Sequence, residues 1–169
     1  SSVVVDLGCG EGKLLTSLAA HIGQGLGIDA SPHMARRATE RATDQGHRNV
    51  QIVLGDFRRL CLRSGSVDAV VSCGAIYHVP DGDKRWMFSQ IASALRAGGV
   101  FHVKDDSFNF PAAELEQRTA QIYEDWRGSF GDAPWAWMKD NLAGDDFECT
   151  PFLEDLKEMI SSAGFRFTD

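Results

Sequence analysis

Short runs of β-branched and other apolar residues alternate, along the first part of the chain, with segments in which apolar side chains recur every three or four positions. The apolar runs predict strands at residues 3–7, 25–29, 50–54, 67–72 and 100–104. The recurring positions predict three helices, with stripes formed by Leu14, Leu18 and Ile22, by Met34, Ala38 and Ala42, and by Met87, Ile91 and Leu95. Strands that alternate with amphipathic helices are typical of stacked βαβ units. The pattern therefore predicts an α/β protein with a doubly wound parallel sheet.

Local signals mark two of the helix ends. Ser31 followed by Pro32 is typical of a helix start, because serine caps the first turn and proline suits the first helical position. Ala97, Gly98 and Gly99 are typical of a helix stop. We expect the second helix to begin at Pro32 and the third to end before Gly98.

The pattern changes at Asp105. Further helices are predicted from the stripe of Leu115, Ile122 and Trp126 and from the stripe of Phe152, Leu156, Ile160 and Ala163. Residues 164–167 predict one more strand, at which the given chain stops. We interpret residues 1–169 as a single domain, with a core at 1–104 and an acidic, Trp-rich excursion and returning helix at 105–163.

Size and composition are those of one ordinary globular domain. The chain has 169 residues, of which 43% are hydrophobic and 24% charged. No apolar run approaches the roughly 18 residues that span a bilayer, and no basic-then-apolar leader opens the chain. Cys9, Cys61, Cys73 and Cys149 form no CxxC pair, which favours free thiols in a reducing compartment. We expect a soluble, cytoplasmic protein with no membrane partner.

The charge is negative and uneven. The formal net charge is −7. Residues 1–104 carry 12 Lys and Arg against 9 Asp and Glu, whereas residues 105–158 carry 4 against 14. Such a chain repels a phosphate backbone, so nucleic acid is disfavoured as a partner. The one local concentration of positive charge, which we interpret as a solvated face, comprises Arg36, Arg37, Arg41, Arg58, Arg59 and Arg63.

The first predicted strand runs directly into a glycine-rich turn, Asp-Leu-Gly-Cys-Gly-Glu-Gly at residues 6–12, which a helix follows. Glycines permit a tight turn and let a ligand approach bare backbone, and a helix start offers unpaired N–H groups. A phosphate-binding P-loop requires Gly at position 7 and Ser or Thr at position 14, but both are Leu. A dinucleotide turn requires its third glycine at position 13, which is Lys. The turn is therefore predicted to bind a different cofactor.

The spacing Asp-x-Gly-x-Gly-x-Gly resembles the first motif of class I S-adenosylmethionine-dependent methyltransferases, and the resemblance covers most of residues 3–104. It implies a Rossmann-like sheet of strand order 3-2-1-4-5 with an edge hairpin, of which the given chain holds only the first strand, around Phe165, so that the hairpin is truncated. It also implies S-adenosylmethionine as the cofactor and S-adenosylhomocysteine as its product. Within the turn, the residues implied to contact the cofactor are Asp6, Gly8, Cys9, Gly10 and Gly12.

The end of the second strand resembles the family's second cofactor segment. Asp29 lies about 20 residues after Gly8, where an acid can accept hydrogen bonds from both ribose hydroxyls. The resemblance implies that Ala30 and Met34 lie along the adenine.

Two further segments resemble the family's third and fourth motifs. Gly55, Asp56 and Phe57 follow the third strand, with Asp56 implied to contact the adenine amino group and the Phe57 amide a ring nitrogen. Cys73 and Gly74 follow the fourth strand and are implied to face the methionine end of the cofactor.

Few residues are candidates for the chemistry itself. Methyl transfer from a sulfonium requires mainly that the acceptor is held near the methyl group, and a base helps when the acceptor is a hydroxyl. His78 follows the fourth strand at the ligand-binding edge and is the candidate base, with a structural role as the alternative. His102, inside the fifth strand, is interpreted as core or as a satisfied polar group. Asp105 and Asp106 are interpreted as loop caps, with proton transfer or cation binding as alternatives, and no metal site is predicted.

The acceptor pocket is predicted on the excursion, because specificity usually resides on variable loops over a rigid scaffold. Its aromatic residues, which predict a lid over a small organic acceptor, include Phe108, Phe110, Tyr123, Trp126, Phe130, Trp135 and Trp137. Acidic charge beside aromatic rings also suits a cationic amine.

The sequence therefore predicts methyl transfer to an oxygen or nitrogen atom of a small molecule. A nucleic-acid or protein methyltransferase, a catalytically silent S-adenosylmethionine-binding protein and, more distantly, a nicotinamide oxidoreductase are the alternatives. The sequence leaves the acceptor and the oligomeric state open.

Overall fold

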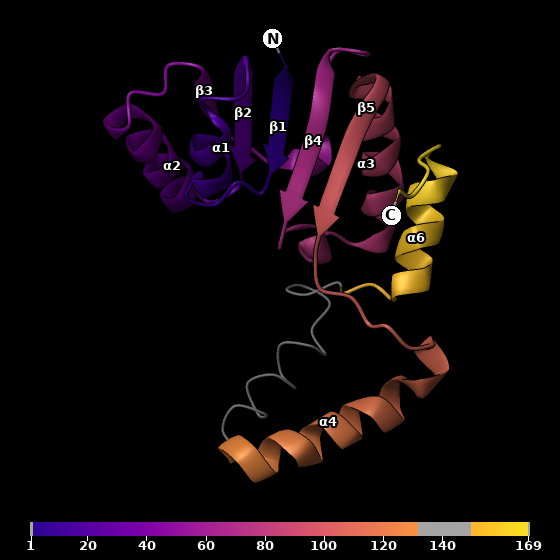
Figure 1. The fold of residues 1–169 in the computed structure, drawn as a ribbon. Coiled ribbons are helices and arrows are strands. Elements are labelled where there is room, and N and C mark those ends of the chain that lie inside the picture. The colour runs from indigo at the N-terminus through magenta and orange to yellow at the C-terminus, as the bar shows by residue number, and fades with distance from the viewer. Residues whose placement is uncertain (1, 132–149, 169) are drawn as a thin grey trace.

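The computed structural model describes residues 2–131 and 150–168. At its centre lies a parallel sheet of order β3-β2-β1-β4-β5 (Figure 1). The strands are β1 at Val3–Leu7, β2 at Gln24–Asp29, β3 at Val50–Leu54, β4 at Val67–Cys73 and β5 at Leu95–Lys104. Every neighbouring pair is parallel. The predicted α/β fold and the strand order 3-2-1-4-5 are confirmed.

Helices cover both faces of the sheet. The helices are α1 at Lys13–Leu18, α2 at Pro32–Asp44, α3 at Asp81–Ala94, α4 at Leu115–Phe130 and α6 at Leu153–Ser162, with short 3-10 turns η1 at Phe57–Arg59, η2 at Ile76–His78 and η3 at Ala112–Glu114. Successive residues of the central strand point to opposite faces, so Val4 packs with Leu15 of α1 while Val5 packs in the cluster that contains Phe88 of α3. Among the described helices, none is both long and apolar enough to cross a membrane.

The predicted start of α2 is confirmed. Pro32 is its first residue, and Ser31 Oγ accepts a hydrogen bond from the N–H group of Met34 at 3.4 Å. The buried face consists of Ala35, Ala38 and Ala42. Met34, which the sequence placed in the buried stripe, is instead 36% exposed, because the stripe passes through the neighbouring residue. The same one-residue offset occurs in α1, where Leu15 is fully buried and Leu14 only partly.

The start of β5 differs from the prediction. The strand begins at Leu95, directly after α3, and its register against β4 shifts between the pairs Val67↔Leu95 and Ala69↔Val100. Gly98 has a φ of 80° inside this irregularity. The predicted helix stop is therefore a bulge within the strand, and the helix ends before it.

The predicted strand at residues 164–167 is not formed. A strand needs a ladder of backbone hydrogen bonds to a neighbour. Phe165 instead packs by its side chain against the sheet, with its ring centroid 5.4 Å from that of Phe101 in β5. The returning helix that precedes it, α6, is confirmed, with Leu156, Met159 and Ile160 buried.

The excursion leaves and rejoins the domain at one point. Phe108 forms an isolated parallel bridge with Phe152, and its N–H group donates to the carbonyl of Pro151 at 2.9 Å. The rings of the two phenylalanines lie 5.4 Å apart. From there α4 extends beyond the carboxyl ends of the strands, away from the sheet (Figure 1). Trp135 and Trp137 of the predicted lid lie outside the described residues.

Gly27 of β2 lies beneath the glycine turn, and its packing yields a stability prediction. A Cβ atom at Gly27 would lie 2.8 Å from Cys9 Sγ and 2.8 Å from Ile52 Cδ1. We expect Gly27→Ala to lower the free energy of unfolding by about 1–3 kcal/mol, the usual cost of overpacking. Gly82→Ala in α3 is the control, because no atom lies within 4 Å of a Cβ there. Urea unfolding measures both variants, and equal midpoints would contradict the prediction.

Candidate active site

An open cleft of about 640 Å³ lies at the carboxyl ends of the strands. Its walls come from the connections that follow β1, β2, β3 and β4, which the strand order brings to one edge of the sheet. Residues predicted from the sequence that line it are Gly8, Gly10, Asp29, Ala30, Met34, Asp56, Phe57, Cys73, Gly74 and His78. The cleft is also lined by four residues that the sequence did not predict as site residues, Ser31, Arg58, Ala75 and Val79.

A smaller cleft of about 210 Å³ shares Gly8 and Cys73 with the first. Its other lining residues are Asp6, Cys9, Glu11, Lys13 and Leu14. Two predicted cofactor residues line neither cleft: Gly12 packs on α2, and Gly55 donates its N–H group to the carbonyl of Asp29 at 2.9 Å. Most of the predicted residues thus line one of two adjoining clefts, and the other two make contacts within the chain.

The three glycines of the turn have different tasks. Gly8, Gly10 and Gly12 all adopt positive φ, at 71°, 52° and 71°, a backbone region that other residues rarely enter. A Cβ atom at Gly8 would clash with Ala75, and one at Gly12 would lie 3.0 Å from the Cβ of Ala38. At Gly10 no atom lies within 4 Å of such a Cβ. Packing therefore requires the outer two glycines, whereas the middle one leaves room for a ligand.

The end of β2 holds this turn in place. The carbonyl of Ile28 accepts hydrogen bonds from two successive N–H groups of the turn at 2.8 and 3.0 Å. Asp29 accepts from the N–H group of Gly10 through Oδ2 at 2.8 Å and from that of Ser31 through Oδ1 at 2.9 Å. Because a carboxylate offers about four acceptor positions, Asp29 retains capacity for further donors in the cleft.

Burial changes the acid–base behaviour of two side chains beneath the turn. Asp6 is only 3% exposed, and burial, followed by the charge of Asp29, raises the pKa of Asp6 to about 6. Burial, followed by the charges of Asp6 and Asp29, raises the pKa of the Cys9 thiol to about 12. Cys9 is therefore a neutral thiol near pH 7 and a poor nucleophile, whereas Asp6 titrates close to neutrality.

Asp56 is paired with an arginine that the sequence pattern assigned to a solvated face. Arg58 Nε lies 3.0 Å from both carboxylate oxygens of Asp56, and Nη2 lies 2.7 Å from Oδ2. The backbone N–H group of Arg58 also donates to Oδ1 at 2.9 Å and so caps η1. Hydrogen bonds from Arg58 lower the pKa of Asp56. An Asp two residues before an Arg at a helix start is the local signal that could have revealed this pair.

His78 lies on η2 in the wall of the large cleft, and its ring is 3.9 Å from that of Tyr77. Asp105, at the end of β5, holds this turn: its Oδ2 accepts hydrogen bonds from the N–H groups of Ile76 at 2.6 Å and Tyr77 at 3.3 Å. The interpretation of Asp105 as a cap is therefore confirmed. The cap links the fifth strand to the segment that carries the candidate base.

His102 was interpreted as a core or satisfied polar residue, but its side chain is exposed. In β5 exposed and partly buried positions alternate, and His102 stands with Val100 and Lys104 on the exposed side. It lines neither cleft. Within residues 2–131 and 150–168, no three His, Cys, Asp or Glu side chains gather closely enough to hold a metal ion.

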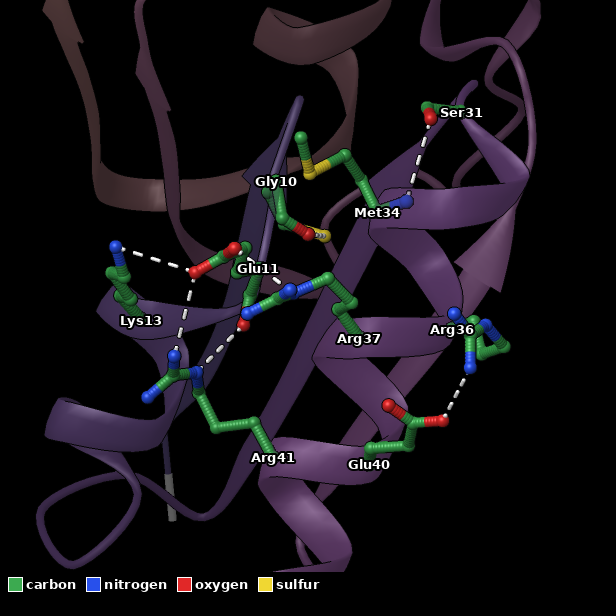
Figure 2. A network of polar contacts seen from close by, with 10 residues as sticks. Gly10, Glu11, Lys13, Ser31, Met34, Arg36, Arg37, Glu40 and Arg41 are labelled. Atoms are coloured by element: carbon green, nitrogen blue, oxygen red, sulfur yellow. Dashed lines mark hydrogen bonds and ion pairs between the residues drawn. The ribbon is translucent and has the colours of Figure 1, made fainter.

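Four of the six arginines in the basic cluster form ion pairs with acidic residues of the same chain. The ion pairs join Arg36 to Glu40 at 3.0 Å, Arg37 to Glu11 at 2.9 Å, Arg41 to Glu11 at 3.5 Å and Arg58 to Asp56 at 2.7 Å. Figure 2 shows the first three of these on α2 and the glycine turn. The interpretation as a solvated face holds for the five of these six arginines that are exposed, and the structure adds ion pairs within the chain that local charge alone does not reveal.

Comparison with known proteins places this geometry in a family. A family model described as "Methyltransferase domain" matches residues 4–99. Carboxy-S-adenosyl-L-methionine synthase of Histophilus somni (strain 2336) is 25% identical over 170 residues, covering 98% of this chain and 69% of that protein. Trans-aconitate 2-methyltransferase of Deinococcus radiodurans is 32% identical over 130 residues, covering 75% of this chain and 47% of that protein.

A solved structure shares the fold. The YcgJ protein of Bacillus subtilis superposes with a TM-score of 0.76 at 20% sequence identity. The match covers 100% of this chain and 64% of that one, so the chain spans less than two thirds of this structural neighbour.

The open space at Gly10 yields a binding prediction. We expect Gly10→Val to abolish binding of S-adenosylmethionine, the cofactor expected from the turn, because the side chain fills the space beside the backbone. Gly46→Val is the matched control: Gly46 also has a positive φ, 73°, with no atom within 4 Å of a Cβ, but it lies outside both clefts. Calorimetric titration measures both, and retained affinity in Gly10→Val would refute the placement of the ligand.

Proposed function

The chain belongs to the class I S-adenosylmethionine-dependent methyltransferases, and we propose that it transfers the methyl group of this cofactor to an oxygen or nitrogen atom of a small organic molecule. The observation that carries this proposal is the large cleft at the strand ends. There the open backbone of Gly10, the carboxylates of Asp29 and Asp56, and the imidazole of His78 line one hollow.

The residues of the large cleft fit the adenosine part of the cofactor. We assign Asp29 to the ribose hydroxyls, because its carboxylate lies in the lining and has acceptor positions beyond the two used by backbone. Asp56 and the backbone of Phe57 are assigned to the adenine edge, and Ala30 and Met34 to its face. The exposed side chain of Met34 supports this assignment, since a thioether packs well on a ring.

The smaller cleft fits the amino-acid end of the cofactor. Asp6 and Lys13, which line it, have opposite charge and so suit an ammonium and a carboxylate. Cys73 belongs to both clefts, and Gly74 follows it in the lining of the larger one. We therefore assign these two residues to the region of the sulfur atom, between the two ends of the cofactor.

In the proposed reaction the chain orients the acceptor and removes its proton. The bound cofactor supplies a methyl group already activated by a positive sulfur. We assign His78 as the base that accepts the proton of a hydroxyl acceptor. Asp105 fixes the turn that carries His78 through two backbone hydrogen bonds. An amine acceptor needs only to be bound in its neutral form.

Charge favours a small acceptor over a nucleic acid. The chain carries a net charge of −7, and the arginines beside the cofactor turn are paired with Glu11. The relative from Deinococcus radiodurans is named for methylating trans-aconitate, a small organic acid. The relative from Histophilus somni is named for making carboxy-S-adenosyl-L-methionine, so product analysis should also seek an altered cofactor.

We divide the domain by these roles. Residues 1–104 form the cofactor-binding core, and residues 105–163 form the acceptor side with its returning helix. The division is supported by the departure of the excursion from β5 beside Asp105, which contacts the turn that carries His78.

A parallel titration tests the function. We expect S-adenosylmethionine and S-adenosylhomocysteine to bind and NAD not to bind. We then expect the chain to methylate an acceptor from a panel of phenols, amines and carboxylic acids, with the product detected by mass spectrometry.

A substitution tests the role of His78 as the base. With a hydroxyl acceptor, His78→Gln should lower kcat by about 10²–10⁴-fold without weakening cofactor binding. His102→Gln is the matched control, because His102 lines neither cleft. Equal loss in both variants would refute the role of His78.

Asp6 yields a pH prediction. Because the pKa of Asp6 is about 6, its carboxyl group is mostly protonated and neutral below that pH and mostly ionised above it. Since an ionised Asp6 attracts the ammonium of the cofactor, affinity should rise from about pH 5 to about pH 7.5 and then level off. Asp6→Asn should bind with an affinity that does not change over this range. Calorimetric titration with S-adenosylmethionine at several pH values measures both affinities. A wild-type affinity that is independent of pH would contradict the assignment of Asp6.

A further inference from the structure

Three arginines of α2 lie close together in sequence but divide between two partners. Arg37 and Arg41, one helical turn apart, point toward Glu11 in the glycine turn, while Arg36 points away toward Glu40 (Figure 2). A helix places residues four apart on one face, so a single face of α2 is turned to the glycine turn.

Glu11 is held by this face at three atoms. Arg37 Nε lies 2.9 Å from Glu11 Oε1, and Arg41 Nη2 lies 3.5 Å from Oε2. Arg41 Nε also donates to the backbone carbonyl of Glu11 at 2.9 Å. Lys13 adds an ion pair at 3.3 Å. Because Arg41 contacts both the carbonyl and the carboxylate, it fixes the backbone of the turn as well as the side chain.

The contact acts on the glycine-rich part of the cofactor site. Glu11 lies between Gly10, whose backbone borders the open space of the cleft, and Gly12, where an added Cβ atom would lie 3.0 Å from the Cβ of Ala38 in α2. The N–H group of Gly10 is bound to Asp29, and Asp29 also binds Ser31 at the start of α2. The segment 10–12 is therefore bound at Gly10 to the end of β2 and lies at Gly12 against α2.

We propose that Arg37 and Arg41 are positioning residues, which hold the glycine turn through Glu11 in the shape that binds the cofactor. The inference rests on the proposed cofactor site and extends it from Glu11, which lines the smaller cleft, to two arginines that lie outside both clefts. Neither arginine lines a cleft, so neither touches the cofactor in this arrangement.

We expect loss of these contacts to lower the affinity for the cofactor rather than the stability of the fold. The side chains of Glu11, Arg41 and Arg37 are 25%, 30% and 47% exposed, and ion pairs at such sites contribute little to folding. A turn with three glycines, however, has many alternative shapes. If only about a tenth of the molecules keep the binding shape, the apparent Kd rises about tenfold while kcat at saturating cofactor stays the same.

Calorimetric titration of the chain with S-adenosylmethionine tests the proposal. We expect Arg41→Gln and Glu11→Gln each to raise the Kd about tenfold. Arg41→Lys should lie between Arg41→Gln and wild type, because lysine keeps the charge but cannot hold two oxygens in a fork. The double variant Glu11→Gln/Arg41→Gln should be little weaker than the worse single variant, since both remove one network.

Arg36→Gln is the matched control, because Arg36 is a neighbouring arginine of the same helix with an exposed partner. Its Kd should stay within about twofold of wild type. Melting temperatures that fall while the Kd stays constant in Arg41→Gln and Glu11→Gln would overturn the positioning role and leave the proposed function intact. A wild-type chain that binds no S-adenosylmethionine would overturn both.

Discussion

The hydrogen bonds from the glycine turn to the end of β2 are the constraint on which the site depends. A turn with three glycines has little conformational preference and loses much entropy when it is ordered. The carbonyl of Ile28 and the carboxylate of Asp29 accept the N–H groups of three successive turn residues. Because β2 lies between two other strands, the acceptors are fixed by the sheet, and the turn takes its shape from them. A ligand therefore meets a surface that is already formed.

The strand order extends this constraint to the rest of the cleft. β1 lies between β2 and β4, so the connections that follow these strands leave the same edge of the sheet toward opposite faces. The gap between them is the large cleft, with Asp29 on one side and His78 on the other. Asp105 closes the arrangement by tying the end of β5 to the turn that carries His78. Groups that are distant in sequence thus become parts of one wall.

Most of the fold could be predicted because its signals are local. Apolar runs marked all five strands, and the strand order followed from the family resemblance of the turn. Predictions were wrong where contacts with distant parts of the chain determine the local structure. Met34 lies one position away from the buried stripe of its helix, and Phe165 packs by its ring instead of pairing as a strand. The contact of Arg41 with Glu11 joins residues 30 apart in the chain, so no spacing rule reveals it. Most of the predicted site residues line the two clefts, whereas Gly12 and Gly55 line neither, and the roles of all of them toward a ligand stay predictions.

Negative charge at the ends of the strands is partly a consequence of how the backbone there is held. Asp29, Asp56 and Asp105 each follow a strand or begin a turn, and each accepts hydrogen bonds from backbone N–H groups. Carboxylates bound in this way are held in position, and two of them, Asp29 and Asp56, place negative charge in the wall of the large cleft. A phosphate backbone meets repulsion at such an edge, whereas a cofactor with an ammonium and a sulfonium meets attraction. The same side chains that shape the backbone therefore favour a cationic cofactor.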